Sequence, residues 1–314
     1  MKTLILARGA FASLVIGRKS PKDFALVLGA ALLAGIAQPG LAQVQVEVTL
    51  EQEQFLQGES VPVAVRIINR SGQTLHLGKD ADWLTFSVES REGFVVAKLG
   101  DAPVAGEFTL DSSKVGIKRV DLQPWFGLSL PGRYEIVATV RIKEWGEQRA
   151  SPAKAFNIIH GAFLWEREFG VPQPDGAKNA APEVRKYVLQ QANYLKGQLR
   201  LYLSLTDGSG ARVFRVFPVG TMVSFSRPEA QLDKASDLHL LYANGGHSYS
   251  YTVFNPDGDL LARQTYDYVN TRPRLQLDED GNIAVAGGSH RVTANDVPAP
   301  KPATPDVPDQ APKP

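Results

Sequence analysis

A gapless internal repeat constrains the fold of this chain more than any other feature of its sequence. RPEAQLDKASDLHLLY at 227–242 is matched forty-five residues later by RPRLQLDEDGNIAVAG at 272–287. Arg-Pro and Gln-Leu-Asp are identical in the two copies, and apolar residues match apolar residues in the second half. A period of about 40–50 residues built from paired hairpins is typical of β-blade architectures. The sequence therefore predicts a repeated structural unit.

Two hairpin patterns accompany the repeat. LRLYLSLT (199–206) and ARVFRVFPV (211–219) flank a Gly-Ser-rich turn, and HSYSYTVFNPDGDLLARQTYDY (247–268) turns at Asn-Pro-Asp-Gly. Apolar alternation on both sides of such turns predicts antiparallel strands. Between residues 181 and 191 the pattern instead predicts a short helix with Pro182 in its first turn.

Residues 161–292 therefore resemble the β-propeller blade repeats of sialidase-like proteins. The resemblance implies a blade-like antiparallel β-meander, and it carries over no catalytic residues, because no arginine triad is recognisable here. A closed propeller needs about four blades, whereas this segment has room for about two and a half. An open meander, a small barrel or a unit covered by the first domain is the expected arrangement, and a ring of several chains is the remaining alternative.

Residues 43–160 show the two-residue period of short strands. VQVEVTL (44–50), SVPVAVRIIN (60–69) and YEIVATVRI (134–142) are the clearest examples. The other expected strands are 74–77, 83–88, 94–99, 107–110 and 156–159. Short strands at roughly ten-residue spacing predict a β-sandwich.

QGESVPVAVRIINRSGQTLHL and LPGRYEIVATVRI in this segment resemble immunoglobulin-like domains of the macroglobulin type found in bacterial secreted proteins. The resemblance implies that Tyr134 occupies the corner before a core strand. Ile136 would then stand where immunoglobulin domains carry the second core cysteine, and Trp83 would be a core aromatic residue.

The two ends of the chain have distinct compositions. Residues 1–42 combine a basic leader with an apolar run, FALVLGAALLAGIA, and small residues before Gln43, which predicts a signal peptide. The apolar run is shorter than the roughly 20 residues of a membrane span, so no stable span is expected after cleavage; an uncleaved anchor is the alternative. Residues 293–314 are proline-rich and predict a disordered tail; a spacer through the envelope or a ligand for a proline-binding module is the alternative. Export to the periplasm or the extracellular space follows.

Charge and cysteine content exclude several classes of function. Removing the leader leaves 29 basic and 32 acidic residues, so no basic face for nucleic acid is expected. The chain has no cysteine, which excludes disulfides and a thiol nucleophile. No cofactor motif is present, and the five histidines lack zinc-ligand spacing.

One short stretch has carboxylates at alternating positions. DEDGN at 278–282 contains Asp278, Asp280 and Asn282, as calcium loops do, but its glycine and its twelfth position do not match an EF-hand. Turn chemistry explains the same residues without a metal. Calcium is the alternative reading.

Five tyrosines lie on neighbouring expected strands: Tyr242, Tyr249, Tyr251, Tyr266 and Tyr268. They fit either cross-strand pairs within a sheet or a tyrosine-rich binding face for an envelope protein or a glycan. The leading hypothesis is a non-enzymatic binding or assembly protein of the bacterial envelope. The alternatives are a glycan-active hydrolase with dispersed carboxylates and a protease inhibitor acting through sandwich loops.

Overall fold

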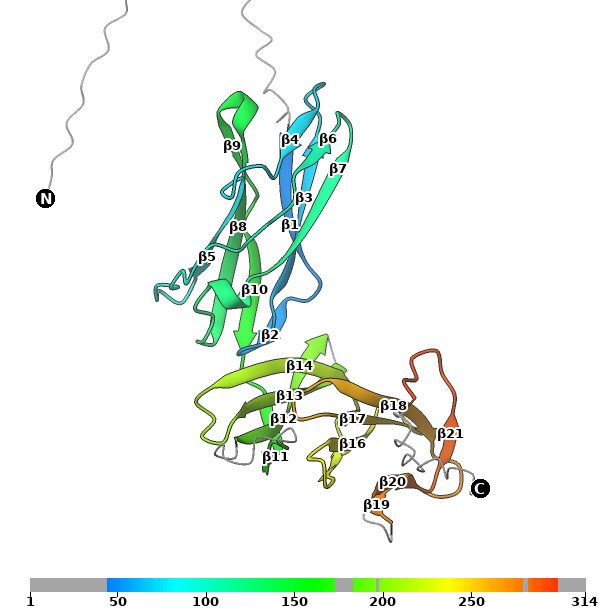
Figure 1. The fold of residues 1–314 in the computed structure, drawn as a ribbon. Coiled ribbons are helices and arrows are strands. Elements are labelled where there is room, and N and C mark those ends of the chain that lie inside the picture. The colour runs from blue at the N-terminus through cyan, green and yellow to red at the C-terminus, as the bar shows by residue number, and fades with distance from the viewer. Residues whose placement is uncertain (1–43, 173–182, 196–197, 279–281, 299–314) are drawn as a thin grey trace, which may run out of the picture. The chain divides into compact units, whose positions relative to one another are not determined.

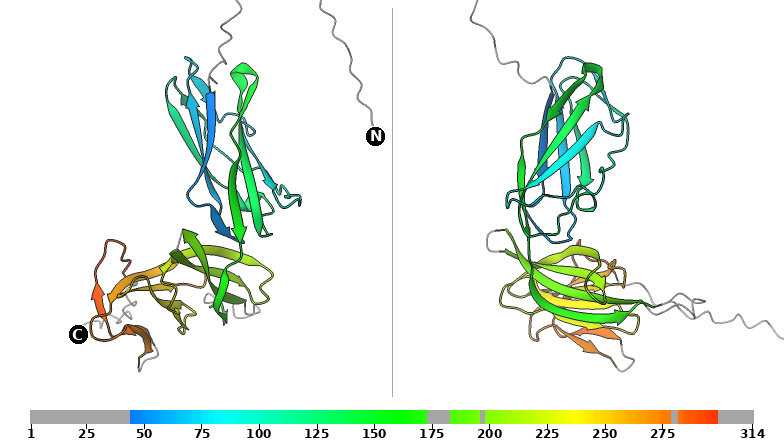
Figure 2. Two further views of the ribbon diagram at one scale, coloured as in Figure 1. Left: turned by 180° about the vertical axis from the view of Figure 1, so that it is seen from behind. Right: turned by 90° about the vertical axis from the view of Figure 1, so that its left-hand side faces the viewer.

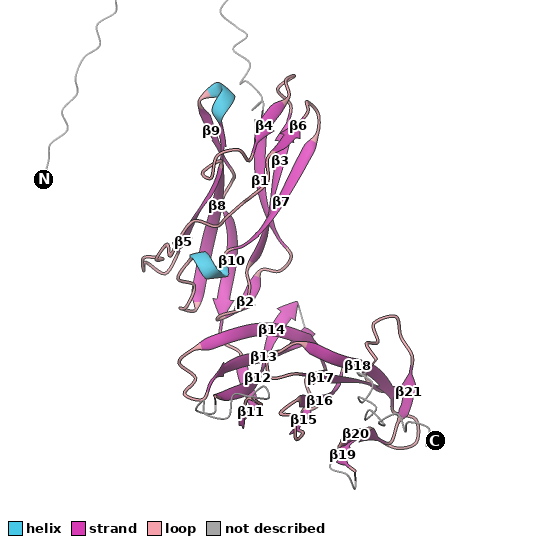
Figure 3. Cartoon of the chain, viewed as in Figure 1, coloured by secondary structure: helices cyan, strands magenta, loops and turns pink. Residues whose placement is uncertain are grey.

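The structure is a computed structural model that describes residues 44–172, 183–195, 198–278 and 282–298 (Figure 1). The predicted signal peptide, 1–42, lies outside the described residues. The chain is all-β. The described ranges contain strands and two short 3₁₀ helices, and they contain no α-helix (Figure 3). Accordingly, no helix in this part of the chain has the length and apolar character needed to cross a membrane.

The first part of the chain is a β-sandwich. One sheet has the order β1 (Val44–Leu50), β3 (Pro62–Asn69), β7 (Val115–Asp121). The other has the order β2 (Gln54–Leu56), β10 (Lys154–Ile159), β8 (Gly132–Ile142), β5 (Leu84–Ser90), and β9 (Glu147–Ala150) also pairs with β8. A small ladder joins β4 (Leu75–Leu77) to β6 (Phe108–Leu110). All of these pairs are antiparallel except β2 with β10.

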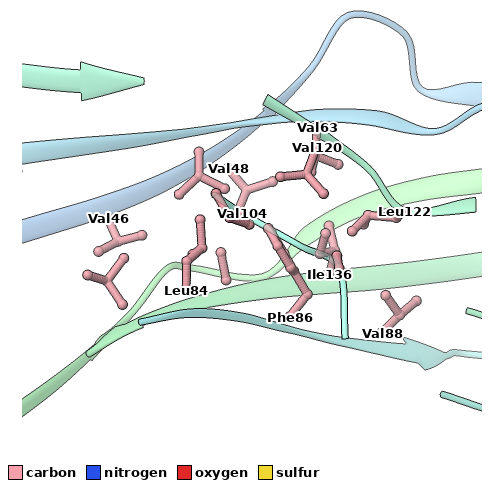
Figure 4. Close-up of a cluster of buried hydrophobic side chains, with 14 of the residues drawn as sticks. Val46, Val48, Val63, Leu84, Phe86, Val88, Val104, Val120, Leu122 and Ile136 are labelled. Carbon is pink, nitrogen blue, oxygen red and sulfur yellow. The ribbon is translucent and has the colours of Figure 1, made fainter. Parts of the chain in front are cut away.

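The core of the sandwich lies between the two sheets, where side chains from alternate positions of each strand meet (Figure 4). Ile136 is fully buried on β8, and Trp83 is buried with its indole N–H donating to the Val104 carbonyl at 2.9 Å. Tyr134 is also fully buried, and its hydroxyl donates to the Leu130 carbonyl at 2.6 Å. These three residues occupy the core positions that the sequence predicted.

The expected strand at 94–99 is wrong. The segment belongs to a long connection between β5 and β6, and its only ladder contact is a bridge from Lys98 to Phe126. Phe94 and Val96 pack on the core while Val95 is 94% exposed, so the strand-like alternation is real, but it anchors a loop. Strands β2, β7 and β9 were not expected, because each is short or lacks a buried apolar face.

The second part begins with a four-stranded antiparallel meander whose strands are neighbours in chain order (Figure 2). It contains β11 (Ala162–Gly170), β12 (Val184–Leu195), β13 (Gln198–Asp207) and β14 (Val213–Met222). The predicted helix at 181–191 is therefore wrong where the chain is described. Tyr187 and Leu189 are fully buried two residues apart, which is the period of a strand and overrides the helix propensity of the polar residues on either side of them.

A second antiparallel sheet continues the meander. Its order is β15 (Glu229–Leu232), β16 (Leu238–Ala243), β17 (Ser248–Phe254), β18 (Leu260–Asp267) and β21 (Ser289–Arg291). A separate hairpin contains β19 (Arg274–Leu277) and β20 (Ile283–Ala286). We call β15–β16 the inner hairpin and β19–β20 the terminal hairpin.

The sequence repeat is a structural repeat. In the inner hairpin Glu229 faces Leu241 and Leu232 faces Leu238, and in the terminal hairpin Arg274 faces Ala286 and Leu277 faces Ile283. Each pair of the terminal hairpin lies forty-five residues after its equivalent in the inner hairpin. The two hairpins therefore share strand lengths, turn length and pairing. Register is fixed by turn geometry and hydrophobic pattern, both of which the repeat preserves.

The three layers of the second part stack through two apolar clusters. One face of the second sheet packs on the first sheet through Leu238, Leu240 and Tyr242. Its opposite face, with Leu241 and Tyr251, packs on Leu275 and Ile283 of the terminal hairpin. Every residue of β16 is consequently buried.

Two arginines fasten the second sheet to the first at one end. Arg185 on β12 donates to Asp257 Oδ1 at 2.7 Å and to the Pro256 carbonyl at 2.9 Å. Arg215 on β14 donates to Asp259 Oδ1 at 2.9 Å and to the Gly258 carbonyl at 3.1 Å.

Ordered structure extends past residue 293, where the tail was expected to begin. The backbone groups of Val297 and Arg263 exchange two hydrogen bonds of 2.9 Å, which holds the chain against β18. The rest of the predicted tail, 299–314, lies outside the described residues.

Candidate functional site

The acidic stretch 278–282 closes a hairpin turn. Asp278 Oδ1 accepts the Asn282 backbone N–H at 2.7 Å, and Asp278 Oδ2 accepts the Asn282 side-chain amide at 3.1 Å. Asp280 lies outside the described residues. The described part of the chain contains no group of three acidic or histidine side chains arranged to hold a metal ion.

The same turn recurs in the second sheet. Asp233 Oδ1 accepts the Asp237 N–H at 2.9 Å, and Asn255 Oδ1 accepts the Asp259 N–H at 2.8 Å. In each turn the first residue also closes the ladder by donating its backbone N–H to the carbonyl four residues later. Asp or Asn ends each of these strands because its side chain satisfies the turn's backbone donors.

The structure separates Tyr242 from the other candidate tyrosines. Tyr242 is 3% exposed and faces the first sheet, whereas Tyr249 and Tyr251 point to the opposite face of the same sheet. Tyr266 joins them there, because it pairs directly with Tyr249 across β17 and β18. Tyr268 lies just beyond β18 and is 42% exposed.

Tyr251 belongs to a buried polar line on the face that the terminal hairpin covers. Its hydroxyl lies 2.7 Å from His239 Nδ1, and His239 Nε2 lies 3.4 Å from Asp233 Oδ2. A neutral imidazole with its proton on Nε2 satisfies both contacts, accepting from Tyr251 and donating to Asp233. Burial raises the pKa of Tyr251 to about 12 and lowers the pKa of His239, so both groups are neutral at pH 7.

Three connections between strands meet at the end of the meander opposite the aspartate turns. The Val223 N–H donates to the Ala243 carbonyl at 3.0 Å, and the Tyr268 N–H donates to the His247 carbonyl at 2.7 Å. The first bond links the β14–β15 connection to the end of β16, where the β16–β17 connection begins, and the second links the β16–β17 connection to the β18–β19 connection. The exposed residues of all three connections therefore lie at one end.

This aromatic end has five members: Phe225, His247, Tyr249, Tyr268 and Arg272. Phe225 is 83% exposed. The Arg272 guanidinium lies 5.6 Å from the Tyr249 ring centroid, and the rings of His247 and Tyr268 are 6.1 Å apart. Aromatic and arginine side chains presented together can bind a partner by stacking, apolar contact and hydrogen bonding.

Sequence reasoning found Tyr249 and Tyr268 but missed Phe225 and Arg272. Phe225 directly precedes Ser226-Arg227-Pro228, and Arg272 is the arginine of the second Arg-Pro motif, so both lie in residues read as connections. Their place at one end depends on the meander bringing three connections there, which strand alternation alone does not reveal.

Comparisons with known proteins add no family. No family model matches the chain, and no curated protein matches it significantly. Among solved structures, the sporulation control protein Spo0M from Bacillus subtilis aligns at 10% identity with a TM-score of 0.30. The alignment covers 52% of this chain and 80% of that chain. A likeness at this TM-score carries no argument about fold or function.

Proposed function

We propose that this chain is an exported, non-enzymatic binding or assembly protein of the bacterial envelope, with an immunoglobulin-like sandwich and a blade-like meander. The observation that supports binding is the aromatic end. Phe225 is 83% exposed on a connection braced by a backbone hydrogen bond, and Tyr268 is 42% exposed on another connection at the same end. Exposed aromatic side chains on fixed backbone are typical binding anchors, because little conformational entropy is lost when they are covered.

The composition of the aromatic end favours a protein partner. Phenylalanine, tyrosine and arginine are enriched at protein interfaces, and Val269, 66% exposed, adds apolar surface next to Tyr268. A glycan of the envelope is the other partner that stacking tyrosines suit.

The test compares three forms of the chain, residues 43–314, immobilised and exposed to an envelope extract of the bacterium that encodes it. The wild type and Leu277→Ala, which removes a 57% exposed side chain from the opposite end, should retain the same protein. The double variant Phe225→Ala with Tyr268→Ala should retain at least about tenfold less, a loss of roughly 1.4 kcal/mol or more.

A second arm uses purified cell-wall glycan with the same three forms. Sedimentation of the wild type with glycan, lost in the double variant, would assign the aromatic end to a glycan instead. Equal retention by all three forms in both arms would refute binding through this end.

Protease inhibition is a second candidate function, supported by the connection between β5 and β6. Val95 and Leu99 are 94% and 65% exposed there. Phe94 and Val96 anchor the connection to the core, and the Leu99 N–H donates to the Trp125 carbonyl at 2.8 Å. A braced, protruding loop suits a protease cleft, so residues 43–314 should slow a serine protease in a panel and Val95→Asp should abolish the effect. No inhibition across the panel would rule out this role.

A further inference from the structure

The terminal hairpin lacks the neighbour that the inner hairpin has. In the inner hairpin the outer side of β16 pairs with β17, where Leu238 faces Phe254 and Leu240 faces Thr252. The equivalent strand, β20, pairs with β19 and with no other strand of the described residues. The repeat thus supplies an internal template for a strand position beside β20.

The backbone of β20 presents hydrogen-bonding groups to that position. The Asp278 N–H donates to the Asn282 carbonyl at 2.9 Å, which fixes the alternation of the ladder. Ala284 and Ala286 therefore direct their N–H and C=O groups toward β19, while Ile283 and Val285 direct theirs away from it. The residues equivalent to Ile283 and Val285, namely Leu238 and Leu240, use these groups to bond β17.

The two edges of the terminal hairpin differ in protection. On β19 the outward N–H of Leu275 is capped by Glu229 Oε2 at 2.8 Å. The sequence of β20, Ile-Ala-Val-Ala, has no charge and no proline. Charged residues and prolines ordinarily block edge strands from pairing, and β20 has neither, so its edge is open to pairing.

The outward face of the terminal hairpin is closed to further stacking. Where the inner hairpin has His239 and Leu241 facing the next layer, the terminal hairpin has Ala284 and Ala286. Small residues there, beside the exposed Arg274 and Gln276, make a polar end face like that of a capping repeat. Growth of the structure is therefore favoured at the edge and not on the face.

The geometry points to a second copy of this chain as the occupant of the β20 edge, with the two β20 strands pairing antiparallel across a two-fold axis. Antiparallel pairing of identical strands generates that symmetry directly. The product, β19-β20 with its symmetry mate, is a sheet of four antiparallel strands, the number found in the β11–β14 meander.

The chain's own C-terminal segment does not fit this edge. From Pro298 onward a proline recurs at least every fourth residue, and proline supplies no N–H to a ladder. The dimer goes beyond the proposed function and does not depend on it, since self-association and partner binding use different residues.

Sedimentation equilibrium of residues 43–314 tests the dimer over about 1–200 µM, because a short edge interface is expected to give a micromolar dissociation constant. Ala284→Lys and Ala284→Glu each place like charges close together across the axis and should weaken the dimer at least about tenfold. Mixing the two variants should restore a dimer. Ala211→Lys, at an exposed turn of the first sheet, is the matched control and should dimerise like the wild type.

Val285→Pro gives an independent check, because it removes an outward N–H without touching the β19 ladder. It should also abolish the dimer, while circular dichroism of all variants stays that of the wild type. A wild type that is monomeric throughout overturns the inference and leaves the edge to a strand of another protein. A dimer that Ala284→Lys does not weaken also overturns it, by placing the interface elsewhere.

Discussion

The inner and terminal hairpins share a register but not an environment. Both have four paired positions, a five-residue turn and an aspartate that accepts the turn's backbone N–H. Every residue of β16 is buried, whereas β20 has one buried residue among four. Backbone pairing is therefore encoded locally, while burial is imposed by the layers and strands on either side.

The substitutions between the two copies follow this difference. His239, Leu241 and Asp237 of the inner hairpin correspond to Ala284, Ala286 and Asn282 of the terminal hairpin. Leu241 packs on the terminal hairpin, and His239 contacts Tyr251 of the same face, whereas no further layer covers the terminal hairpin among the described residues. Equivalent substitutions in the two copies should consequently separate two contributions to the free energy of unfolding: that of the hairpin itself and that of the layers and strands packed around it.

The largest expected effect comes from truncating the equivalent positions Leu240 and Val285. Leu240 is fully buried between the two sheets, so Leu240→Ala should lower the free energy of unfolding by about 3 kcal/mol. Val285 is only partly buried, so Val285→Ala should cost about 1 kcal/mol. Urea unfolding followed by circular dichroism measures both, with an unchanged slope as the control. Equal losses would show that the layers do not create the difference.

The sequence predicted the all-β class, the sandwich core and the repeat, because each depends on short-range alternation and turn residues. Tyr134, Ile136 and Trp83 lie in the core, and β1 has its predicted bounds. The same reasoning favoured turn chemistry at 278–282 with calcium as the alternative, and the hydrogen bonds that Asp278 accepts from Asn282 are those of a turn.

Long-range arrangement could not be predicted from the same signals. Tyr242 and Tyr251 both read as strand tyrosines, and only the stacking of layers sends them to different clusters. The segment at 184–195 carries polar helix-forming residues, and its two-residue period becomes decisive only when Tyr187 and Leu189 meet the neighbouring sheet. Whether the five tyrosines bind a ligand remains a prediction.

The second-largest effect is expected at His239, whose counterpart is Ala284. His239→Ala should lower the free energy of unfolding by about 2 kcal/mol, because it leaves the buried Tyr251 hydroxyl without its 2.7 Å partner. In a Tyr251→Phe background the same change should cost about 1 kcal/mol less, since no hydroxyl is left unsatisfied. Urea unfolding of the four proteins in this cycle measures the coupling. Additive losses would show that the contact contributes nothing.

A smaller effect, an increase in stability, is expected when Asp237 is replaced by asparagine, the residue at the equivalent position 282 of the terminal hairpin. Burial, aided by the charge of Asp233, raises the pKa of Asp237 to about 6 from the model-compound value of 3.8. The folded state therefore binds this proton more tightly than the unfolded state, and its stability falls as pH rises from about 4 to about 6. Above that window Asp237→Asn should be more stable than the wild type by about 1 kcal/mol.

The measurement is thermal or urea unfolding of both proteins at about pH 4, near the unfolded-state pKa of Asp237, and at about pH 8, above its folded-state pKa. The difference between them should be largest at the higher pH and shrink toward the lower one. His239, whose pKa is lowered by burial, acts in the opposite sense but is common to both proteins, so it cancels. If Asp237→Asn were less stable than the wild type at pH 8, the buried charge of Asp237 would not be what destabilises the folded state.

The smallest expected effect separates turn chemistry from calcium binding in the terminal hairpin. Both oxygens of Asp278 already accept hydrogen bonds from Asn282, so a cation would have to break them to gain ligands. An extracellular calcium module that binds at about 10⁻⁴–10⁻³ M would be mostly occupied at about 2 mM calcium and would raise the melting temperature by several degrees. A turn that is already satisfied by hydrogen bonds should shift it by less than about 1 °C. Magnesium chloride at the same concentration controls for ionic strength. A rise of several degrees with calcium alone, abolished by Asp278→Ala but not by Asp233→Ala, would instead establish a calcium site in the terminal copy and make the two turns chemically different.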